Sequence, residues 1–302
     1  MMYHTPILFL IFNRPDTTAK VFERICRIKP AKLYVAADGP RENRPGETQQ
    51  CMQTRAVIAQ IDWPCELKTL YRDKNLGCRM AVSEAISWFF EQEEYGVILE
   101  DDCLPDLSFF PFCEELLIKY KDDDRIGHIG GNCFFPSLLS NSLSYDFCSF
   151  AHIWGWASWR RVWKNFDVDF KYWEEARKDK NKKKNLLKNT RELLYFSSYI
   201  SDAIGENKGM KIWDVQYFFM LRVQNQLSIY PALNLVTNLG LNHPHATNTQ
   251  NSGTKGCIPA STMPFPLKHP RYVMENRTIN KYVMKYNFFS YRRILRYLLN
   301  DY

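Results

Sequence analysis

The chain has 302 residues, of which 45% are hydrophobic, enough to form one large core or a core with a small appendage. No apolar run approaches the ~18 residues that cross a bilayer, which argues against a membrane-spanning protein. Nine cysteines without a Cys-x-x-Cys pair argue against a zinc ribbon and give no disulfide framework. Because we find no export signal, we expect reduced thiols and a cytoplasmic protein.

The formal net charge of +7 is concentrated in two stretches of the chain. Residues 177–188 hold seven Lys or Arg against Asp179, and residues 268–302 hold eight against Glu275 and Asp301. The rest of the chain is therefore mildly acidic. Basic stretches of this kind are typical of contact with an anionic membrane surface or with nucleic acid. As a secondary hypothesis we expect peripheral contact with the inner face of the plasma membrane, and we expect no nucleic acid partner.

Strand-like and helix-like runs alternate in the first half of the chain. Short apolar runs predict strands at Ile7–Phe12, Leu33–Ala37, Leu67–Tyr71, Val97–Leu99 and Ile126–Ile129. The stretches between them predict helices at Thr17–Arg27, Thr48–Ile61, Cys78–Glu91 and Ser108–Tyr120. Such alternation is typical of βαβ units, so we expect an α/β fold with a mostly parallel sheet flanked by helices.

The second half of the chain has a different character. Residues 145–173 are rich in aromatic side chains, and a polar loop region follows at about 237–262. The segment Phe288–Leu299 places its apolar side chains on one helical face and three arginines beside them, which predicts an amphipathic basic helix. This helix either packs on its own domain or docks on a membrane or a partner protein.

Three consecutive acids, Glu100, Asp101 and Asp102, follow the apolar run Tyr95–Leu99. Acids at the carboxyl end of a buried strand lie where open α/β sheets bind ligands. Burying three acids without a cation is costly, so we expect Mg²⁺ or Mn²⁺ together with a diphosphate. The acidic run Asp122–Asp124 lacks a preceding apolar strand of this kind, and we expect it to be a solvated loop.

Polar residues also follow the other predicted strands, at the same edge of the sheet. Arg14 follows the first strand and is suited to a base or a phosphate. Asp38 follows the second, where its carboxylate can accept from a base N–H or a ribose hydroxyl, although Asp38-Gly39 is also typical of a simple turn. Arg79 lies at the predicted start of a helix, a position suited to an anion. Together these residues predict a nucleotide-sugar site.

The order of these motifs resembles that of GT-A-fold glycosyltransferases. The motifs are Phe12-Asn-Arg-Pro15, Ala37-Asp-Gly-Pro40, Asn75-Leu-Gly-Cys-Arg79 and Ile98-Leu-Glu-Asp-Asp102. The Glu-Asp-Asp form is similar to the N-acetylglucosaminyltransferase I family and to bacterial nucleotide-diphospho-sugar transferases. The phrase Trp154–Trp163 resembles a block of those bacterial proteins. The resemblance covers roughly residues 3–250.

The resemblance implies a metal-dependent, inverting transferase that moves a sugar from a UDP-sugar, UDP-GlcNAc being one candidate, to a hydroxyl of a glycan or lipid-linked glycan. Arg14 and Asp38 would hold the uridine, and Glu100 would contact the donor. Asp101 would bind ribose or metal, and Asp102 would be the principal ligand of Mn²⁺ or Mg²⁺, which neutralises the leaving diphosphate. The bacterial relatives suggest a role in cell-envelope polysaccharide synthesis.

The second half supplies candidates for the remaining roles. Asp214 is the candidate general base, or else it caps the helix that starts near Val215. Gly155 and Trp156 are the pair we assign to the donor or acceptor side, because glycine permits close backbone approach.

Two histidines are candidates for a late metal ligand. Many GT-A enzymes have such a histidine, and in the bacterial relatives it stands where this chain has Asn248. His243 and His245 are the possible substitutes, and either is equally a loop residue without a ligand role.

The resemblance divides the chain into a GT-A domain of residues 1–262 and a basic helical extension of residues 263–302. The domain has a nucleotide-binding half, 1–130, and an acceptor half, 131–262. Two other functions stay open. A sugar-nucleotide nucleotidyltransferase is disfavoured because the loop Asn13–Asp16 has no glycine. A non-enzymatic protein would use its basic stretches to bind nucleic acid or an anionic surface.

Overall fold

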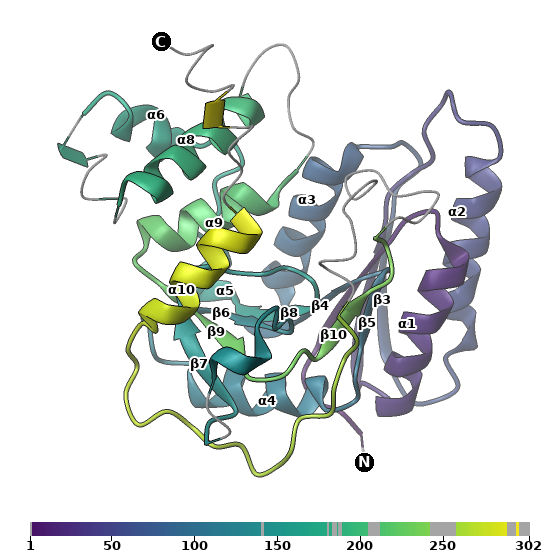
Figure 1. The fold of residues 1–302 in the computed structure, drawn as a ribbon. Coiled ribbons are helices and arrows are strands. Elements are labelled where there is room, and N and C mark those ends of the chain that lie inside the picture. The colour runs from purple at the N-terminus through teal and green to yellow at the C-terminus, as the bar shows by residue number, and fades with distance from the viewer. Residues whose placement is uncertain are drawn as a thin grey trace.

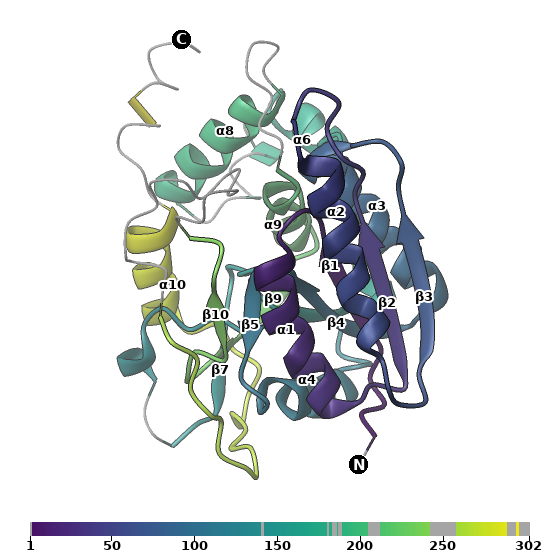
Figure 2. The same cartoon turned by 90° about the vertical axis from the view of Figure 1, so that its right-hand side faces the viewer.

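A computed structural model describes residues 2–139, 142–179, 181–182, 186, 189–204, 212–241, 258–288 and 294–295. Its centre is an eight-stranded mixed sheet in the order β3-β2-β1-β4-β8-β6-β9-β7 (Figure 1). Helices α1 and α2 cover one face of the β3–β1 half and α3 covers the other (Figure 2). The expected α/β fold, a mostly parallel sheet flanked by helices, is confirmed.

The parallel half of the sheet follows the predicted elements closely. Its strands are β1 (Ile7–Ile11), β2 (Lys32–Ala37), β3 (Glu66–Tyr71) and β4 (Tyr95–Glu100). Its helices are α1 (Pro15–Ile28), α2 (Glu47–Ala56) with the 3₁₀ turn η1 (Val57–Gln60), α3 (Gly77–Gln92) and α4 (Phe109–Lys119). Because β1 pairs in parallel with β2 and β4, their carboxyl ends meet at one edge of the sheet.

The other half of the sheet contains antiparallel strands that the sequence did not predict. β8 (Trp156–Trp159) runs between β4 and β6 (Ile126–Gly130), antiparallel to both. β9 (Leu227–Pro231) is parallel to β6 and pairs with antiparallel β7 (Tyr145–Cys148) at the sheet edge. β5 (Cys103–Pro105) and β10 (Val236–Asn238) form a separate two-stranded sheet. The aromatic-rich segment therefore supplies core strands.

Further helices and a long connection complete the described part of the chain. The helical elements are η2 (Pro136–Leu138), α5 (Arg160–Trp163), α6 (Lys171–Ala176), α8 (Thr190–Ile204), α9 (Asp214–Val223), α10 (Arg277–Val283) and its π-helical continuation η4 (Met284–Phe288). Upstream of α10, Met263 N–H donates to Ser108 Oγ and Lys268 N–H donates to Ser144 Oγ. This connection therefore lies against the main body, while the division at residues 262 and 263 stays a prediction.

Three further expectations concern residues that the structure describes only in part. No helix within the described ranges is long and apolar enough to span a membrane. The cysteines that the structure describes are all free thiols. The predicted amphipathic helix Phe288–Leu299 lies largely outside the described residues.

Candidate functional site

A cavity of about 330 Å³ opens at the carboxyl ends of β1, β2 and β4. Polar residues that the sequence singled out come together in its wall. They are Arg14, Asp38, Glu100, Asp101, Asp102 and Asp214. This position is the one at which open α/β sheets bind ligands.

The three acids are held by the end of β4 and the turn that follows it. Glu100 is the last residue of β4 and is paired with Leu10 of β1. The N–H of Phe12, just after β1, donates to Asp101 Oδ2 at 3.2 Å. The main-chain oxygen of Asp102 accepts from Leu239 N–H at 2.7 Å, just beyond β10. The acids are therefore fixed by both sheets.

Arg14 supplies positive charge to this cluster. Its Nη1 donates to Asp102 Oδ2 at 2.6 Å, and its Nη2 lies 3.6 Å from Asp101 Oδ1. Burial alone would lower the pKa of Arg14, but Asp101 and Asp102 raise it above its ordinary value. Arg14 thus stays charged in a half-enclosed site and offsets part of the acidic charge.

Glu100 is the least satisfied of the three acids. Burial, and then the neighbouring charges of Asp102 and Asp101, raises its pKa to about 8. Its Oε1 is buried and has no hydrogen-bond partner among the described residues. A buried carboxylate oxygen of this kind is stabilised by a cation.

The chemistry of these donors fits Mg²⁺ or Mn²⁺. No group of three or more His, Cys, Asp or Glu side chains in the described ranges forms a metal cage. Mg²⁺ does not require one, because it is commonly held by one or two carboxylates together with substrate phosphates. Asp102 as principal ligand and Asp101 as a second ligand stay predictions. The unpartnered Oε1 of Glu100 makes this residue a further possible ligand.

Asp214 combines a place in the cavity wall with the start of a helix. It is the first residue of α9, and Trp213 occupies the N-cap position, so Asp214 is not the cap that the sequence offered as an alternative. Its Oδ1 accepts from Val215 N–H at 3.0 Å. Burial raises the pKa of Asp214 to about 6, and the main-chain donors partly oppose this. A carboxylate with such a pKa is suited to take up a proton near neutral pH.

Asp38 is fully engaged with the protein itself. Its Oδ1 accepts from the N–H groups of Gly39 and Leu76, both at 2.9 Å. Its Oδ2 accepts from Asn75 Nδ2 at 2.9 Å and from Gly77 N–H at 3.1 Å. Four donors use the lone pairs that a carboxylate has available. The carboxylate therefore fastens the turn before α3, as the simple-turn alternative foresaw in part, and contact with uridine stays a prediction.

Two predicted site residues have other neighbours. The Nη2 atom of Arg79 donates to the Val168 carbonyl at 2.6 Å and lies 3.5 Å from Asp169 Oδ1. Gly155 has a φ of +67°, and a Cβ there would lie 2.7 Å from a methyl group of Val236. Glycine is thus required for backbone geometry and packing, and neither Arg79 nor Gly155 belongs to the cavity lining that the structure describes.

Trp156 lies in the core of the sheet. It is fully buried, and its ring stacks on His128 at 5.4 Å and on Trp213 at 5.9 Å between centroids. It is therefore not positioned to touch a donor or acceptor in the cavity. The preceding residues Ile153 and Trp154 line the cavity instead.

Several cavity residues were not among the predicted ones. Arg41, Cys78, Trp154 and Asn238 also line the cavity. The guanidinium of Arg41 lies 5.5 Å from the centre of the Phe12 ring. Arg41 follows the Asp-Gly-Pro motif directly, which is a usable sequence signal, whereas Asn238 lies on β10, which had no clear strand pattern. His243 and His245 lie outside the described residues, so their ligand role stays a prediction.

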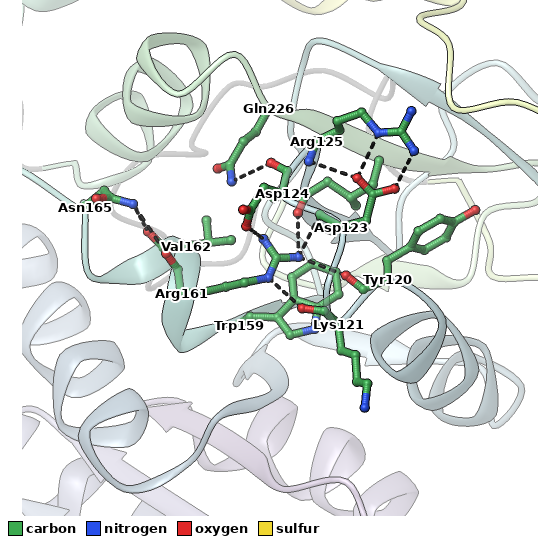
Figure 3. A network of polar contacts seen from close by, with 12 residues as sticks. Tyr120, Lys121, Asp123, Asp124, Arg125, Trp159, Arg161, Val162, Asn165 and Gln226 are labelled. Carbon is green, nitrogen blue, oxygen red and sulfur yellow. Dashed lines mark hydrogen bonds and ion pairs between the residues drawn. The ribbon is translucent and has the colours of Figure 1, made fainter.

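The competing acidic run, Asp122–Asp124, is a surface turn, as expected. The side chains of Asp122 and Asp124 are 86% and 93% exposed. The Arg161 guanidinium reaches under the turn and donates to main-chain oxygens, including those of Asp123 and Ile126 at 3.0 Å (Figure 3). This arrangement stabilises the turn and leaves no buried acid for a metal.

Comparisons with known proteins gave structural matches of low identity and low TM-score. No family model matches the chain, and no curated protein does. Among solved structures, HddC from Yersinia pseudotuberculosis matches with 8% identity and a TM-score of 0.33, over 56% of this chain and 85% of that chain. HddC has also been solved in complex with GMP-PN.

Two further solved structures match part of this chain at similarly low identity. The inositol-1-phosphate CTP transferase from T. maritima matches with 9% identity and a TM-score of 0.30, over 54% of this chain and 73% of that one. The 4-diphosphocytidyl-2C-methyl-D-erythritol synthase from Anaerococcus prevotii matches with 10% identity and a TM-score of 0.32, over 72% and 97%. Matches at this level of similarity say nothing of the reaction.

Proposed function

We propose that this chain is a metal-dependent glycosyltransferase that moves a sugar from a UDP-sugar to a hydroxyl of a glycan or lipid-linked glycan, with inversion. One observation carries the proposal. Glu100–Asp102, Arg14 and Asp214 line the same cavity at the carboxyl edge of the sheet. The clustered acids and the Arg14 guanidinium suit a nucleoside diphosphate with its metal ion on one side of the cavity. The separate carboxylate of Asp214, with its raised pKa, suits a proton acceptor on the other side.

In the proposed reaction, the acceptor oxygen attacks the anomeric carbon of the donor sugar. The bond from that carbon to the diphosphate oxygen breaks, and UDP leaves with the bonding electrons. Asp214 takes the proton of the acceptor hydroxyl. Its pKa of about 6 keeps it ionised at neutral pH and makes it a stronger base than an ordinary aspartate.

Asp102 would be the principal metal ligand, with Glu100 and Asp101 beside it. A bound Mn²⁺ or Mg²⁺ would supply positive charge against the leaving diphosphate. Arg14 is held at the same acids, where its guanidinium can turn to a phosphate oxygen when the donor enters.

The second candidate is a sugar-nucleotide nucleotidyltransferase. In that reaction a sugar phosphate oxygen attacks the α-phosphate of a nucleoside triphosphate, and pyrophosphate leaves. The same cavity acids would serve it, because a divalent ion held by carboxylates also suits a triphosphate. Against it, the loop Asn13–Asp16 has no glycine to cradle a triphosphate, and its Arg14 pairs with acids.

One experiment separates the two reactions. The protein is incubated with Mn²⁺ and a panel of nucleotide sugars, and released nucleoside diphosphate is measured. In parallel it receives nucleoside triphosphates with sugar 1-phosphates, and pyrophosphate is measured. Metal-dependent UDP release supports glycosyl transfer, pyrophosphate alone supports the second candidate, and neither product contradicts both.

A further inference from the structure

The helical segment α10–η4 has two faces of opposite character. Ile279, Val283 and Met284 are buried, and α10 packs against β7. Figure 2 shows α10 at the outer side of the molecule, away from β3. The exposed side chains of the segment include Arg277, Lys281, Tyr282, Lys285 and Tyr286.

The exposed charge of this region has one sign. Between residues 268 and 288 the sequence holds a single acid, Glu275. Its carboxylate accepts hydrogen bonds from Ser149 and Asn280, and it is half-buried in a surface hollow that Asp146 and Arg271 also line. The Asn276 side chain caps α10 by accepting from the next helical N–H groups. The segment is thus firmly placed, and the charges on its outer face are cationic.

Aromatic rings lie among these cations. The Tyr282 and Tyr286 rings are 5.7 Å apart and pack on Phe135 at 5.9 and 5.7 Å. The Lys285 ammonium lies 4.8 Å from the centre of the Tyr286 ring. Tyrosine rings mixed with lysine are typical of surfaces that rest at a lipid headgroup layer.

Apolar exposure continues on the chain just before α10. Tyr272 is 65% exposed and Met274 is 70% exposed, the two highest values among the large hydrophobic side chains that the structure describes. The Arg271 guanidinium lies 5.3 Å from the centre of the Tyr272 ring. These three residues repeat the combination of a cation with an exposed apolar group found on α10–η4.

We propose that this surface docks on an anionic lipid bilayer. We define the docking face by its exposed residues, which are Arg271, Tyr272, Met274, Arg277, Lys281, Tyr282, Lys285 and Tyr286. The charged side chains among these exposed residues are all positive and complement anionic headgroups, whereas the neighbouring Asp146 and Glu275 are half-buried. The rings and Met274 suit the boundary with acyl chains. Nucleic acid is a poorer partner, because Tyr282, Tyr286 and Phe135 pack on one another and do not stand apart to receive bases.

Ring contacts relate the docking face to the cavity. Phe135 contacts Tyr282 and Tyr286 of the docking face, and its neighbour Phe134 packs edge-on to Trp154 at 5.5 Å. Trp154 lines the cavity. Docking would therefore place the cavity near acceptors held at the membrane. This consequence rests on the proposed function, whereas the docking itself does not.

The test is co-sedimentation of the full chain with vesicles. Vesicles of phosphatidylcholine alone are compared with vesicles that contain one third phosphatidylglycerol, at low and at high salt. We expect binding to the anionic vesicles that weakens with salt. The double variant Lys281→Ala/Lys285→Ala should bind roughly 25-fold more weakly, because each basic residue near the surface contributes about fivefold. Tyr282→Ala/Tyr286→Ala should also bind more weakly.

The matched control is Lys20→Ala/Lys164→Ala. It removes the same charge from exposed positions on α1 and after α5, and its affinity should stay close to that of the unaltered protein. Equal loss in the control and the docking-face variant would overturn the proposal, since general charge attraction would then explain binding. The proposal would also be overturned if the unaltered protein did not bind anionic vesicles. The same holds if it bound RNA but not vesicles, and the docking-face variants lost that RNA binding. Vesicle binding without any sugar transfer would contradict the proposed function and leave the docking intact.

Discussion

Nη1 of Arg14 lies 2.6 Å from Oδ2 of Asp102. The two residues come from loops that follow β1 and β4, which are hydrogen-bonded neighbours in the sheet. Three adjacent acids at one strand end repel one another, and this repulsion adds to burial in raising the pKa of Glu100. The guanidinium offsets part of that repulsion, and a divalent ion in the same site would offset more.

Arg14→Gln should therefore make the stability of the fold depend on metal. Without divalent ions we expect a loss of about 3 kcal/mol in the free energy of unfolding, because a partly buried carboxylate loses its partner. Added Mn²⁺ should restore most of this loss. Urea unfolding with Mn²⁺ or with EDTA measures both effects. Arg27→Gln, which breaks an exposed pair with Glu23, is the control and should respond to neither. A loss that Mn²⁺ does not restore would argue against a metal at these acids.

Asp102→Asn should abolish metal-dependent nucleotide binding. The substitution keeps the size of the side chain but removes the charge that would hold Mn²⁺. The affinity for UDP in the presence of Mn²⁺ should therefore fall by about tenfold or more. Calorimetric titration of UDP with Mn²⁺ and with EDTA measures it. Asp122→Asn removes an acid that is 86% exposed and should bind UDP like the unaltered protein. Equal affinity in both variants would remove Asp102 from the metal site.

The first half of the fold was predictable because its local patterns agree with its tertiary role. β1 and β4 are buried on both faces and appear as apolar runs, and Glu100–Asp102 follow such a run directly. The second half was not, because β8 is a buried strand of aromatic and small residues with no alternation. Which face each tryptophan takes depends on strand register, and a shift of one residue reverses it. The four hydrogen-bond donors to the Asp38 carboxylate could not be predicted either, because three of them lie in a different loop.

Trp154 and Trp156 should respond in opposite ways to alanine substitution. Trp156→Ala should cost about 3–5 kcal/mol of stability, because a large ring is removed from the core. Trp154→Ala should change stability far less and should raise the KM for donor or acceptor, because Trp154 lines the cavity. Thermal unfolding and steady-state kinetics on both variants measure the contrast. An unchanged KM in Trp154→Ala would remove the residue from the substrate site.

Asp38→Ala should destabilise the turn before α3. The substitution leaves the donors of Asn75, Leu76 and Gly77 without their acceptor, and we expect a loss of about 2–4 kcal/mol. Asp73→Ala, in the same loop but exposed, is the matched control and should be nearly neutral. Urea unfolding measures both. If Asp38→Ala instead kept full stability and lost UDP binding, the carboxylate would serve the nucleotide and not the turn.

Asp214→Asn should abolish sugar transfer while leaving UDP–Mn²⁺ affinity nearly unchanged. Loss of a general base typically costs 10²–10⁴-fold in rate, and Asp214 is separate from the acids assigned to the metal. In the unaltered protein, transfer should rise with pH through about 6, because the base must be ionised. Asp169→Asn, at an exposed acid, should keep this profile. Loss of nucleotide binding together with transfer would assign Asp214 a structural role.

The raised pKa of Asp214 also predicts how the stability of the protein depends on pH. The pKa of Asp214 is raised to about 6 in the folded protein. At pH values between the ordinary pKa of an aspartate and about 6, the folded state therefore binds more protons than the unfolded state. Its contribution to stability is therefore present at low pH and is lost as the pH rises through about 6. Asp214→Asn stays neutral, and its Oδ1 can still accept from Val215 N–H. The variant should thus match the unaltered protein near pH 4 and exceed its stability by about 2 kcal/mol at pH 8. Unfolding curves at the two pH values measure this difference in stability. A variant that is less stable than the unaltered protein at pH 8 would show that the charged Asp214 carboxylate does not destabilise the fold.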